Sequence, residues 1–343
     1  MAILWMVDAS FWSMPVGETI LAFIPTPPPV RSRLEEAGYD LRRIQAVGGR
    51  AALVANGQDA RIALTNGEGG LSGAEIDSLP NLELICAIGV GYEAIDLDIA
   101  AVRGITVTNG RGTNDSAVAD HTMALMLTLA SGIVPADAMV RAGDWKSFAL
   151  GAPAYPFAAR RRGVHGKRLG LLGLGQIGSK IAARGHLGFE MPVAYHARNP
   201  VAGSPYRYLA TVRELAEWSD FLVLAAPGGE DTHHLVDAEV LRRLGPEGFL
   251  INIGRGSIVD TDALIEALRS GTICGAGLDV VEGEPDIRAD LLDLDNVVLT
   301  PHMAGRGPEP LELMAELLMK NLAAFLHGEP VLTPILLPAE MAR

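Results

Sequence analysis

The feature that most constrains the fold is a series of six continuous apolar segments in the second half of the chain. Each has the length of a β-strand, and segments with helical patterning separate them. A strand forms an unbroken apolar run when both faces of its sheet are covered, which is typical of parallel sheets. Strands that alternate with helices therefore predict an α/β domain with a doubly wound parallel sheet. The six segments are residues 168–175, 192–197, 220–227, 248–254, 275–280 and 296–302.

The first third of the chain repeats this alternation of strands and helices. Ser72 is a suitable N-cap for one helix, because Glu75 stands three residues later. The proline-rich residues 25–29 are predicted to form a stiff surface connection. The predicted strands are residues 3–9, 39–44, 60–66, 82–89 and 105–109. The predicted helices are residues 30–38, 71–80 and 114–130, and a further helix is predicted near the end of the chain, at residues 310–328.

At 343 residues, the chain exceeds what one compact core usually fills, so we expect two domains. Both should be doubly wound α/β domains, with the chain crossing between them twice. Residues 1–112 and 303–343 would form a discontinuous substrate domain, and residues 113–302 would form the cofactor domain.

Charge and composition exclude several classes of protein. The formal net charge of −13 disfavours nucleic acid and anionic membranes as partners. The N-terminus lacks a basic segment and carries Asp8, unlike a secretory signal. The longest uncharged apolar stretch, residues 122–136, is too short to span a bilayer. Cys86 and Cys274 lie in apolar runs and are expected to be reduced thiols, so the sequence predicts a cytoplasmic protein.

The segment Gly173-Leu-Gly175-Gln-Ile-Gly178 matches the pattern G-x-G-x-x-G between a predicted strand and a predicted helix. In this setting the first glycine permits a tight turn, the second lets the backbone approach a pyrophosphate, and the third lets the helix pack on the strand. The first N–H groups of the helix, which include those of Gln176 and Ile177, would bind the anion. The sequence therefore predicts a dinucleotide site.

The next strand end predicts which dinucleotide binds. A site for NAD places an acidic residue about 20 residues after the glycines, where it accepts from the ribose 2′-hydroxyl. Residues 195–199 contain no acid, and Arg198 lies among them. A guanidinium binds a 2′-phosphate through paired hydrogen bonds, so the sequence favours NADP(H), with NAD(H) as a possible second cofactor.

Three residues with suitable chemistry follow strands of the second series. Arg255 follows residues 248–254, Glu284 follows residues 275–280, and His302 ends the last run. The carboxyl ends of parallel strands are where open α/β sheets bind ligands. Reduction of a 2-keto acid needs a cation for the carboxylate, an acid for the carbonyl oxygen and an electrostatic partner for that acid. Arg255, His302 and Glu284 suit these three roles, respectively.

Over nearly its whole length, the chain resembles the D-isomer-specific 2-hydroxyacid dehydrogenase family. Five segments carry the resemblance, in the order found in that family: residues 89–96, 173–178, 250–260, 276–285 and 300–305. The arginine-bearing, acid-free strand end at residues 195–199 resembles the glyoxylate/hydroxypyruvate reductase branch.

The resemblance implies a flavodoxin-like substrate domain, a Rossmann cofactor domain and specific roles for site residues. Arg255 would bind the substrate, and His302, paired with Glu284, would donate and accept the proton. The N–H groups near Val90 and Gly91 would hold the substrate carboxylate. The remaining expected cofactor contacts are Ala226, Pro227 and Asp279, the last of which could instead hold loop geometry.

We therefore expect an NADPH-preferring reductase of glyoxylate, hydroxypyruvate and similar 2-keto acids. Two alternatives stay open: a formate- or phosphite-type dehydrogenase, and a cofactor-sensing, corepressor-like binding protein. The apolar surface of residues 114–130 and the family resemblance both favour a homodimer.

No Cys/His cluster has the spacing of metal ligands, so no metal is expected. Arg111 and Arg306 could lie at a pocket rim or on the surface, and Trp145 could line a pocket or pack against a helix. The other histidines are expected to be structural: His121, His165, His186, His196, His233, His234 and His327.

Overall fold

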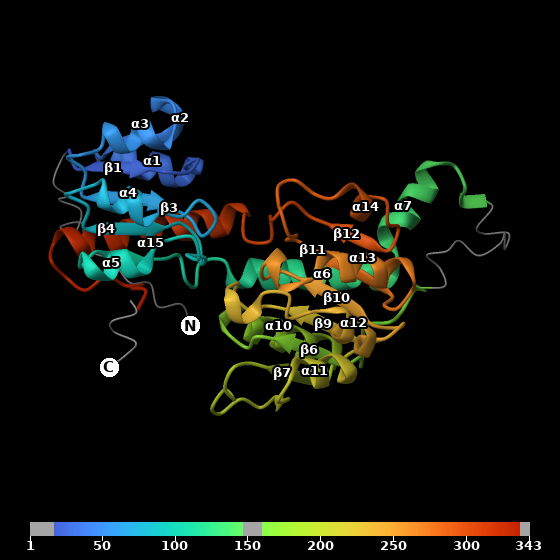
Figure 1. The fold of residues 1–343 in the computed structure, drawn as a ribbon. Coiled ribbons are helices and arrows are strands. Elements are labelled where there is room, and N and C mark those ends of the chain that lie inside the picture. The colour runs from blue at the N-terminus through green and yellow to red at the C-terminus, as the bar shows by residue number, and fades with distance from the viewer. Residues whose placement is uncertain (1–16, 147–159, 337–343) are drawn as a thin grey trace. The chain divides into compact units, whose positions relative to one another are not determined.

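The computed structural model describes residues 17–146 and 160–336 of the chain (Figure 1). It divides into two compact units. One comprises Met1–Asn114 and Arg306–Arg343, and the other comprises Asp115–Gly305. These boundaries lie within three residues of those that the sequence predicts.

The first unit contains a five-stranded sheet in which every neighbouring pair is parallel. The strand order β2-β1-β3-β4-β5 is that of flavodoxin-like folds, as the resemblance implies. The strands are β1 (Thr19–Ala22), β2 (Asp40–Arg43), β3 (Ile62–Thr65), β4 (Leu84–Ala87) and β5 (Thr106–Thr108).

Helices cover both faces of this sheet. The last helix, α15, packs beside α1 on one face although the two are far apart in sequence (red and blue in Figure 1). Helices α3, α4 and α5 contribute to the core on the other face. The helices of this unit are α1 (Pro28–Glu36), α2 (Ile44–Val47), α3 (Arg50–Ala55), α4 (Gly73–Asp77), α5 (Leu97–Val102) and α15 (Pro308–Leu326).

The second unit contains a seven-stranded sheet, again with parallel neighbours throughout. Its order is β12-β11-β10-β9-β6-β7-β8, a Rossmann arrangement with an added edge strand, β12, and a switch point between β6 and β9. The predicted fold class is confirmed. The strands are β6 (Leu169–Leu172), β7 (Val193–His196), β8 (Arg207–Tyr208), β9 (Phe221–Leu224), β10 (Phe249–Asn252), β11 (Gly275–Leu278) and β12 (Val297–Leu299).

Strands β6, β9, β10 and β11 of this sheet are buried on both faces. Along β9, Phe221 and Val223 join the core beneath α6 and α10, whereas Leu222 and Leu224 join the core beneath α11, α12 and α13. This two-sided burial is the physical reason for the unbroken runs. The helices are α6 (Asp115–Ser131), α7 (Ile133–Arg141), α10 (Gln176–Phe189), α11 (Val212–Trp218), α12 (Ala238–Leu244), α13 (Thr261–Arg269) and α14 (Ala289–Leu292), with short 3₁₀ turns η2 (Glu230–Thr232) and η3 (Gly256–Ile258).

The start of the chain differs from the sequence prediction in its first described elements. The predicted strand at residues 3–9 lies outside the described residues, and the first described strand, β1, was not predicted. The proline-rich residues 25–29 are not only a connection, because α1 begins inside them. Pro28 and Pro29 occupy the first helical positions, where a missing N–H costs no hydrogen bond.

The predicted N-cap at Ser72 is confirmed. Its hydroxyl accepts from the Glu75 N–H, and the Glu75 carboxylate accepts from the Ser72 N–H, which forms a capping box. The same carboxylate pairs with Arg50 through contacts of 2.6 and 2.9 Å. Hydrogen bonds from Arg50 lower the pKa of Glu75 to about 2.

The apolar side chains of α6 are mostly buried in the core of their own unit. The expectation that this helix offers a large uncovered surface is therefore wrong. Exposed apolar side chains lie instead on α7, which has no buried residue. Among the described helices, none is alone long and apolar enough to cross a bilayer; α6 and α7 together, bent by 61°, meet that test by length and composition.

Candidate active site and cofactor site

The glycine-rich turn has the geometry that a dinucleotide site requires. Gly173 follows β6 with a φ of +97°, a left-handed conformation that favours glycine. A Cβ at Gly178 would lie 2.2 Å from the Gly173 carbonyl oxygen, so α10 can approach the turn only with glycine there. A Cβ at Gly175 would meet nothing within 4 Å, so the space before it is open.

The open space at Gly175 faces the start of α10, which no side chain caps. Gln176 and Ile177 are the first residues of this 14-residue helix, and their N–H groups have no partner within the helix. Ala226 and Pro227 follow β9, the neighbour of β6 at the switch point of the sheet. The turn therefore fits the pyrophosphate of a dinucleotide.

Arg198 follows the end of β7, the strand next to β6. Its side chain is exposed, and no hydrogen bond or ion pair holds its guanidinium within the described part of the chain. The strand end is tied to the glycine-rich turn, because the Gly173 N–H donates to the His196 carbonyl at 2.8 Å. The arginine thus lies beside the turn, where a bound adenosine ribose would be expected.

Arg255 follows β10 in a turn organised by a buried asparagine. The Asn252 amide donates to the Arg255 carbonyl at 2.9 Å and accepts from the Gly254 N–H at 3.1 Å. The guanidinium itself donates to the Gly254 carbonyl at 2.8 Å. The turn places this cation at the carboxyl end of the sheet.

His302 and Glu284 are brought together, although 18 residues separate them. The Nδ1 atom of His302 lies 2.8 Å from Oε1 of Glu284, and the side chains are 30% and 27% exposed. The other carboxylate oxygen of Glu284 accepts from the Val281 N–H. A partly exposed imidazole held by a carboxylate can give and take a proton.

The backbone of His302 is left-handed, with a φ of +49°. For a residue other than glycine this conformation costs of order 1–2 kcal/mol and must be held by its surroundings. Asp279, only 2% exposed, provides the hold. Its carbonyl accepts from the His302 N–H, and its carboxylate accepts from the N–H groups of Met303 and Ala304 at 2.9 and 3.0 Å. Asp279 therefore fixes the turn that carries His302.

A residue of this site that the sequence analysis did not identify is His121, on α6. Its Nε2 lies 3.0 Å from the Thr300 hydroxyl and 3.5 Å from the Asp279 carboxylate. The Thr300 hydroxyl in turn donates to Asp279 at 2.6 Å. The available signal was a polar pair, His121 and Thr122, within an otherwise apolar helical segment.

A second histidine expected to be structural also contacts a site loop. His234 lies 2.9 Å from Glu282, which accepts from Thr261 at 2.8 Å. Partial burial raises the pKa of Glu282, but hydrogen bonds from His234 and Thr261 outweigh this, so the pKa lies below its usual value. His233, His234 and Glu282 place three possible metal-ligand atoms within 4.8 Å. The two imidazole rings stack, with centroids 4.0 Å apart and an interplanar angle of 25°.

Val90 and Gly91 lie in the other unit, in the loop that follows β4. The Asn109 amide donates to the Val90 carbonyl at 2.7 Å and fixes the loop. Within the described residues, 17–146 and 160–336, neither the Val90 N–H nor the Gly91 N–H donates a hydrogen bond to a protein atom. Two adjacent N–H groups of this kind can bind a carboxylate.

The remaining candidates have less defined surroundings. Trp145 is 66% exposed and is not packed as expected of a core aromatic. Arg111 and Arg306 are exposed, and neither guanidinium has a partner among the residues described.

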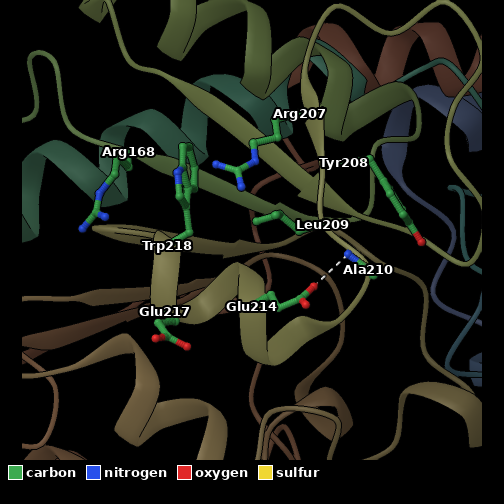
Figure 2. Close-up of a pocket in the computed structure, with 8 residues that line it drawn as sticks. All are labelled: Arg168, Arg207, Tyr208, Leu209, Ala210, Glu214, Glu217 and Trp218. Carbon is green, nitrogen blue, oxygen red and sulfur yellow. Dashed lines mark hydrogen bonds between the residues drawn. The ribbon is translucent and has the colours of Figure 1, made fainter.

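A pocket of about 560 Å³ lies between α11 and β8 (Figure 2). Arg168 lines it and precedes β6, so the pocket reaches the amino ends of the strands. None of the predicted site residues lines it. Its lining residues are Arg168, Arg207, Tyr208, Leu209, Ala210, Glu214, Glu217 and Trp218.

Comparison with known proteins identifies relatives over most of the chain. A glyoxylate/hydroxypyruvate reductase of Arabidopsis thaliana is 39% identical over 263 residues, 76% of this chain and 78% of the relative. A glyoxylate reductase of Thermococcus litoralis is 43% identical over 260 residues, 74% of this chain and 77% of the relative.

Among solved structures, an NADPH-dependent glyoxylate/hydroxypyruvate reductase of Sinorhizobium meliloti, in complex with NADP and malonate, superposes with a TM-score of 0.84 at 37% identity. The match covers 93% of this chain and 96% of that one. The family model of the D-isomer specific 2-hydroxyacid dehydrogenase NAD binding domain matches residues 123–304. The chain therefore belongs to the D-isomer-specific 2-hydroxyacid dehydrogenases, a family of NAD(P)-dependent oxidoreductases.

Proposed function

We propose that this protein is an NADPH-preferring reductase of small 2-keto acids, with glyoxylate and hydroxypyruvate as substrates. The observation that carries the proposal is the 2.8 Å contact between His302 and Glu284, at the same end of the sheet as Arg255. The names of the relatives support the substrate class. In this proposal the unit Asp115–Gly305 holds the cofactor, and the N–H groups of Val90 and Gly91 bind the substrate carboxylate.

The proposed roles follow from the chemistry of each group. When bound, the reduced nicotinamide supplies the hydride to the keto carbon. Because Nδ1 of His302 faces Glu284, its Nε2 gives the proton to the carbonyl oxygen. The Glu284 carboxylate stabilises the imidazolium before transfer. Arg255 binds the substrate carboxylate and carbonyl oxygen, which orients the carbon for attack.

The proposed preference for NADPH rests on Arg198. The end of β7 offers no acidic side chain to a ribose 2′-hydroxyl, and the exposed guanidinium suits a 2′-phosphate. Hydrogen bonds between charged groups contribute about 1.5–3 kcal/mol, which corresponds to roughly 10–150-fold in affinity. Arg198→Ala should therefore lower kcat/KM for NADPH by this factor and leave that for NADH nearly unchanged.

One substrate panel tests the proposal. Glyoxylate and hydroxypyruvate are each assayed with NADPH and with NADH. Formate and phosphite are each assayed with NADP+ and with NAD+. We expect turnover of the keto acids with NADPH, and a loss of about 10²–10⁴-fold in His302→Ala while NADPH binding, followed by fluorescence, persists. Turnover of formate or phosphite alone, or cofactor binding without any turnover, would favour the alternative functions.

We also propose a homodimer in a reducing, cytoplasmic setting. Exposed apolar side chains on α7 support it: Ile133 and Val134 are 52% and 53% exposed, and Val140 is 39% exposed. Both cysteines are free and buried, which fits reducing conditions. Sedimentation at micromolar concentration should give a dimer, and Val134→Glu should shift it towards the monomer. A wild-type monomer would exclude this assembly.

A further inference from the structure

The segment that carries Arg198 is a ten-residue loop, residues 197–206, between β7 and β8. The guanidinium is unengaged in the described structure, so its position depends on the backbone that carries it. A mobile loop would have to lose backbone freedom when a 2′-phosphate binds, and this ordering would weaken binding. The contacts that order the loop in advance therefore affect cofactor choice.

Two tyrosines hold the loop backbone on either side of Arg198. The Tyr195 hydroxyl, in a side chain only 1% exposed, accepts from the Val201 N–H at 2.8 Å. The Tyr208 hydroxyl donates to the Ala197 carbonyl at 3.3 Å. The two rings meet edge to face, with centroids 5.5 Å apart. One hydroxyl thus fixes the residue before the arginine, and the other fixes the chain three residues after it.

Hydrogen bonds between Leu209, which follows Tyr208, and β7 anchor both tyrosines to the sheet. The Tyr195 carbonyl accepts from the Leu209 N–H at 2.8 Å, and Nδ1 of His196 donates to the Leu209 carbonyl at 2.9 Å. The Gly173 N–H donates to the His196 carbonyl. The arginine loop and the glycine-rich turn therefore share one rigid frame, and their separation is set before any ligand binds.

Tyr208 and its neighbour Arg207 point in different directions from β8. Figure 2 shows the Arg207 guanidinium turned towards Trp218, in the pocket beside α11, while the Tyr208 hydroxyl points away from that pocket. Of the two neighbours, Tyr208 therefore contacts the loop that carries Arg198.

We propose that Tyr195 and Tyr208 are positioning residues for cofactor choice. Their hydroxyls hold the backbone around Arg198 so that its guanidinium meets the 2′-phosphate of NADPH without a cost for ordering the loop. NADH has no phosphate and gains nothing from this order. The inference rests on the proposed preference for NADPH and adds the residues that make it effective.

The test compares Tyr195→Phe and Tyr208→Phe, which remove one hydroxyl each and keep the rings, with Tyr206→Phe. Tyr206 lies in the same loop, and no hydrogen bond of its hydroxyl is found among the described residues, so it is a matched control. KM for NADPH should rise about 2–10-fold in Tyr195→Phe, with a smaller rise in Tyr208→Phe, whose contact is longer. In both variants, KM for NADH and kcat should be unchanged. In Tyr206→Phe, KM for NADPH should also keep its wild-type value.

A double-mutant cycle with Arg198→Ala separates positioning from general stability. In that background, Tyr195→Phe should no longer change the ratio of kcat/KM for NADPH to that for NADH. If the tyrosine variants weaken both cofactors equally, or leave the ratio unchanged while Arg198→Ala lowers it, the positioning role is wrong and the NADPH preference stands. If wild type does not prefer NADPH, or Arg198→Ala does not change the ratio, both proposals fail.

Discussion

Glu284→Gln tests the His302–Glu284 pair most directly, because it removes the negative charge and keeps the size of the side chain. The amide oxygen can still accept from Nδ1 across the 2.8 Å contact, while the amide NH₂ replaces the oxygen that accepts from the Val281 N–H, so that hydrogen bond is lost. The imidazole thus keeps its orientation and its tautomer. What it loses is the stabilisation of its protonated form by a full negative charge.

The exposure of the pair sets the size of the effect. Hydrogen bonds to charged groups contribute about 1.5–3 kcal/mol. Solvent reaches 30% of the His302 side chain and 27% of Glu284, so the lower value of about 1.5 kcal/mol applies. Removing the charge should therefore cost the protonated imidazole about 1.5 kcal/mol relative to the neutral form, or roughly tenfold.

The pH profiles of both directions of the reaction should move the same way. Reduction of glyoxylate needs the imidazolium, so kcat/KM falls as the pH rises, and in the variant this fall should occur at lower pH. Oxidation of glycolate needs the neutral imidazole, so its rise with pH should also move to lower pH. Stopped-flow or steady-state assays from pH 5 to pH 9 with both substrates measure the two profiles.

Glu282→Gln is the matched control, since Glu282 lies two residues away and pairs with His234 instead. Its two profiles should keep their wild-type positions. The reasoning is refuted if the Glu284→Gln profiles do not move, move to higher pH, or move in opposite directions for reduction and oxidation.

Three further predictions concern the frame of the site and the fold. Asp279→Asn places an amide N–H₂ against the buried N–H of Met303 or Ala304 and should cost about 2 kcal/mol, seen as a fall in Tm of about 4–8 °C with a lower kcat. Gly175→Ala should keep the wild-type Tm but weaken NADPH binding, whereas Gly178→Ala, whose Cβ would overlap a carbonyl, should lower the Tm. Because the pKa of Glu75 is about 2 when folded, its pair stabilises the fold above pH 4.5 and is lost as the pH falls towards 2. Glu75→Gln should cost about 2 kcal/mol in urea titrations at pH 7 and less at pH 3.

The second sheet could be predicted because burial on both faces of a strand produces a continuous apolar run in the sequence. Six of its seven strands lie in apolar runs of the sequence, and the residues that follow them lie at the carboxyl end of the sheet. Arg198, Arg255 and His302 were placed by this argument alone, since a parallel sheet brings all its carboxyl ends to one edge. The local geometry of Gly173 and Gly178 followed from the same strand–turn–helix context.

The strands that were not predicted, β1 and β8, lack a distinct apolar run. β1 has four residues, and its short apolar run merges with the proline-rich segment that follows. β8 has two residues, Arg207 and Tyr208, with no apolar pattern. It pairs with β7 in parallel and is itself the edge of the sheet. Yet β8 carries the hydroxyl that holds the arginine loop, so a weak local signal does not mean a minor role.

The network around Asp279 shows a different limit, because its members are far apart in sequence. Helical periodicity predicts that α6 is buried but not which atoms its polar residues meet, and His121 precedes Thr300 by 179 positions. The proton arrangement can be worked out only from the contacts. The Thr300 hydroxyl has one proton, which goes to Asp279 at 2.6 Å, so its oxygen must accept from His121 and Nε2 of that imidazole must carry a proton. The Asp279 carboxylate then accepts from the Thr300 hydroxyl and from the N–H groups of Met303 and Ala304. A buried carboxylate is stable only while its donors stay in place, and this condition ties α6 to the turn that carries His302.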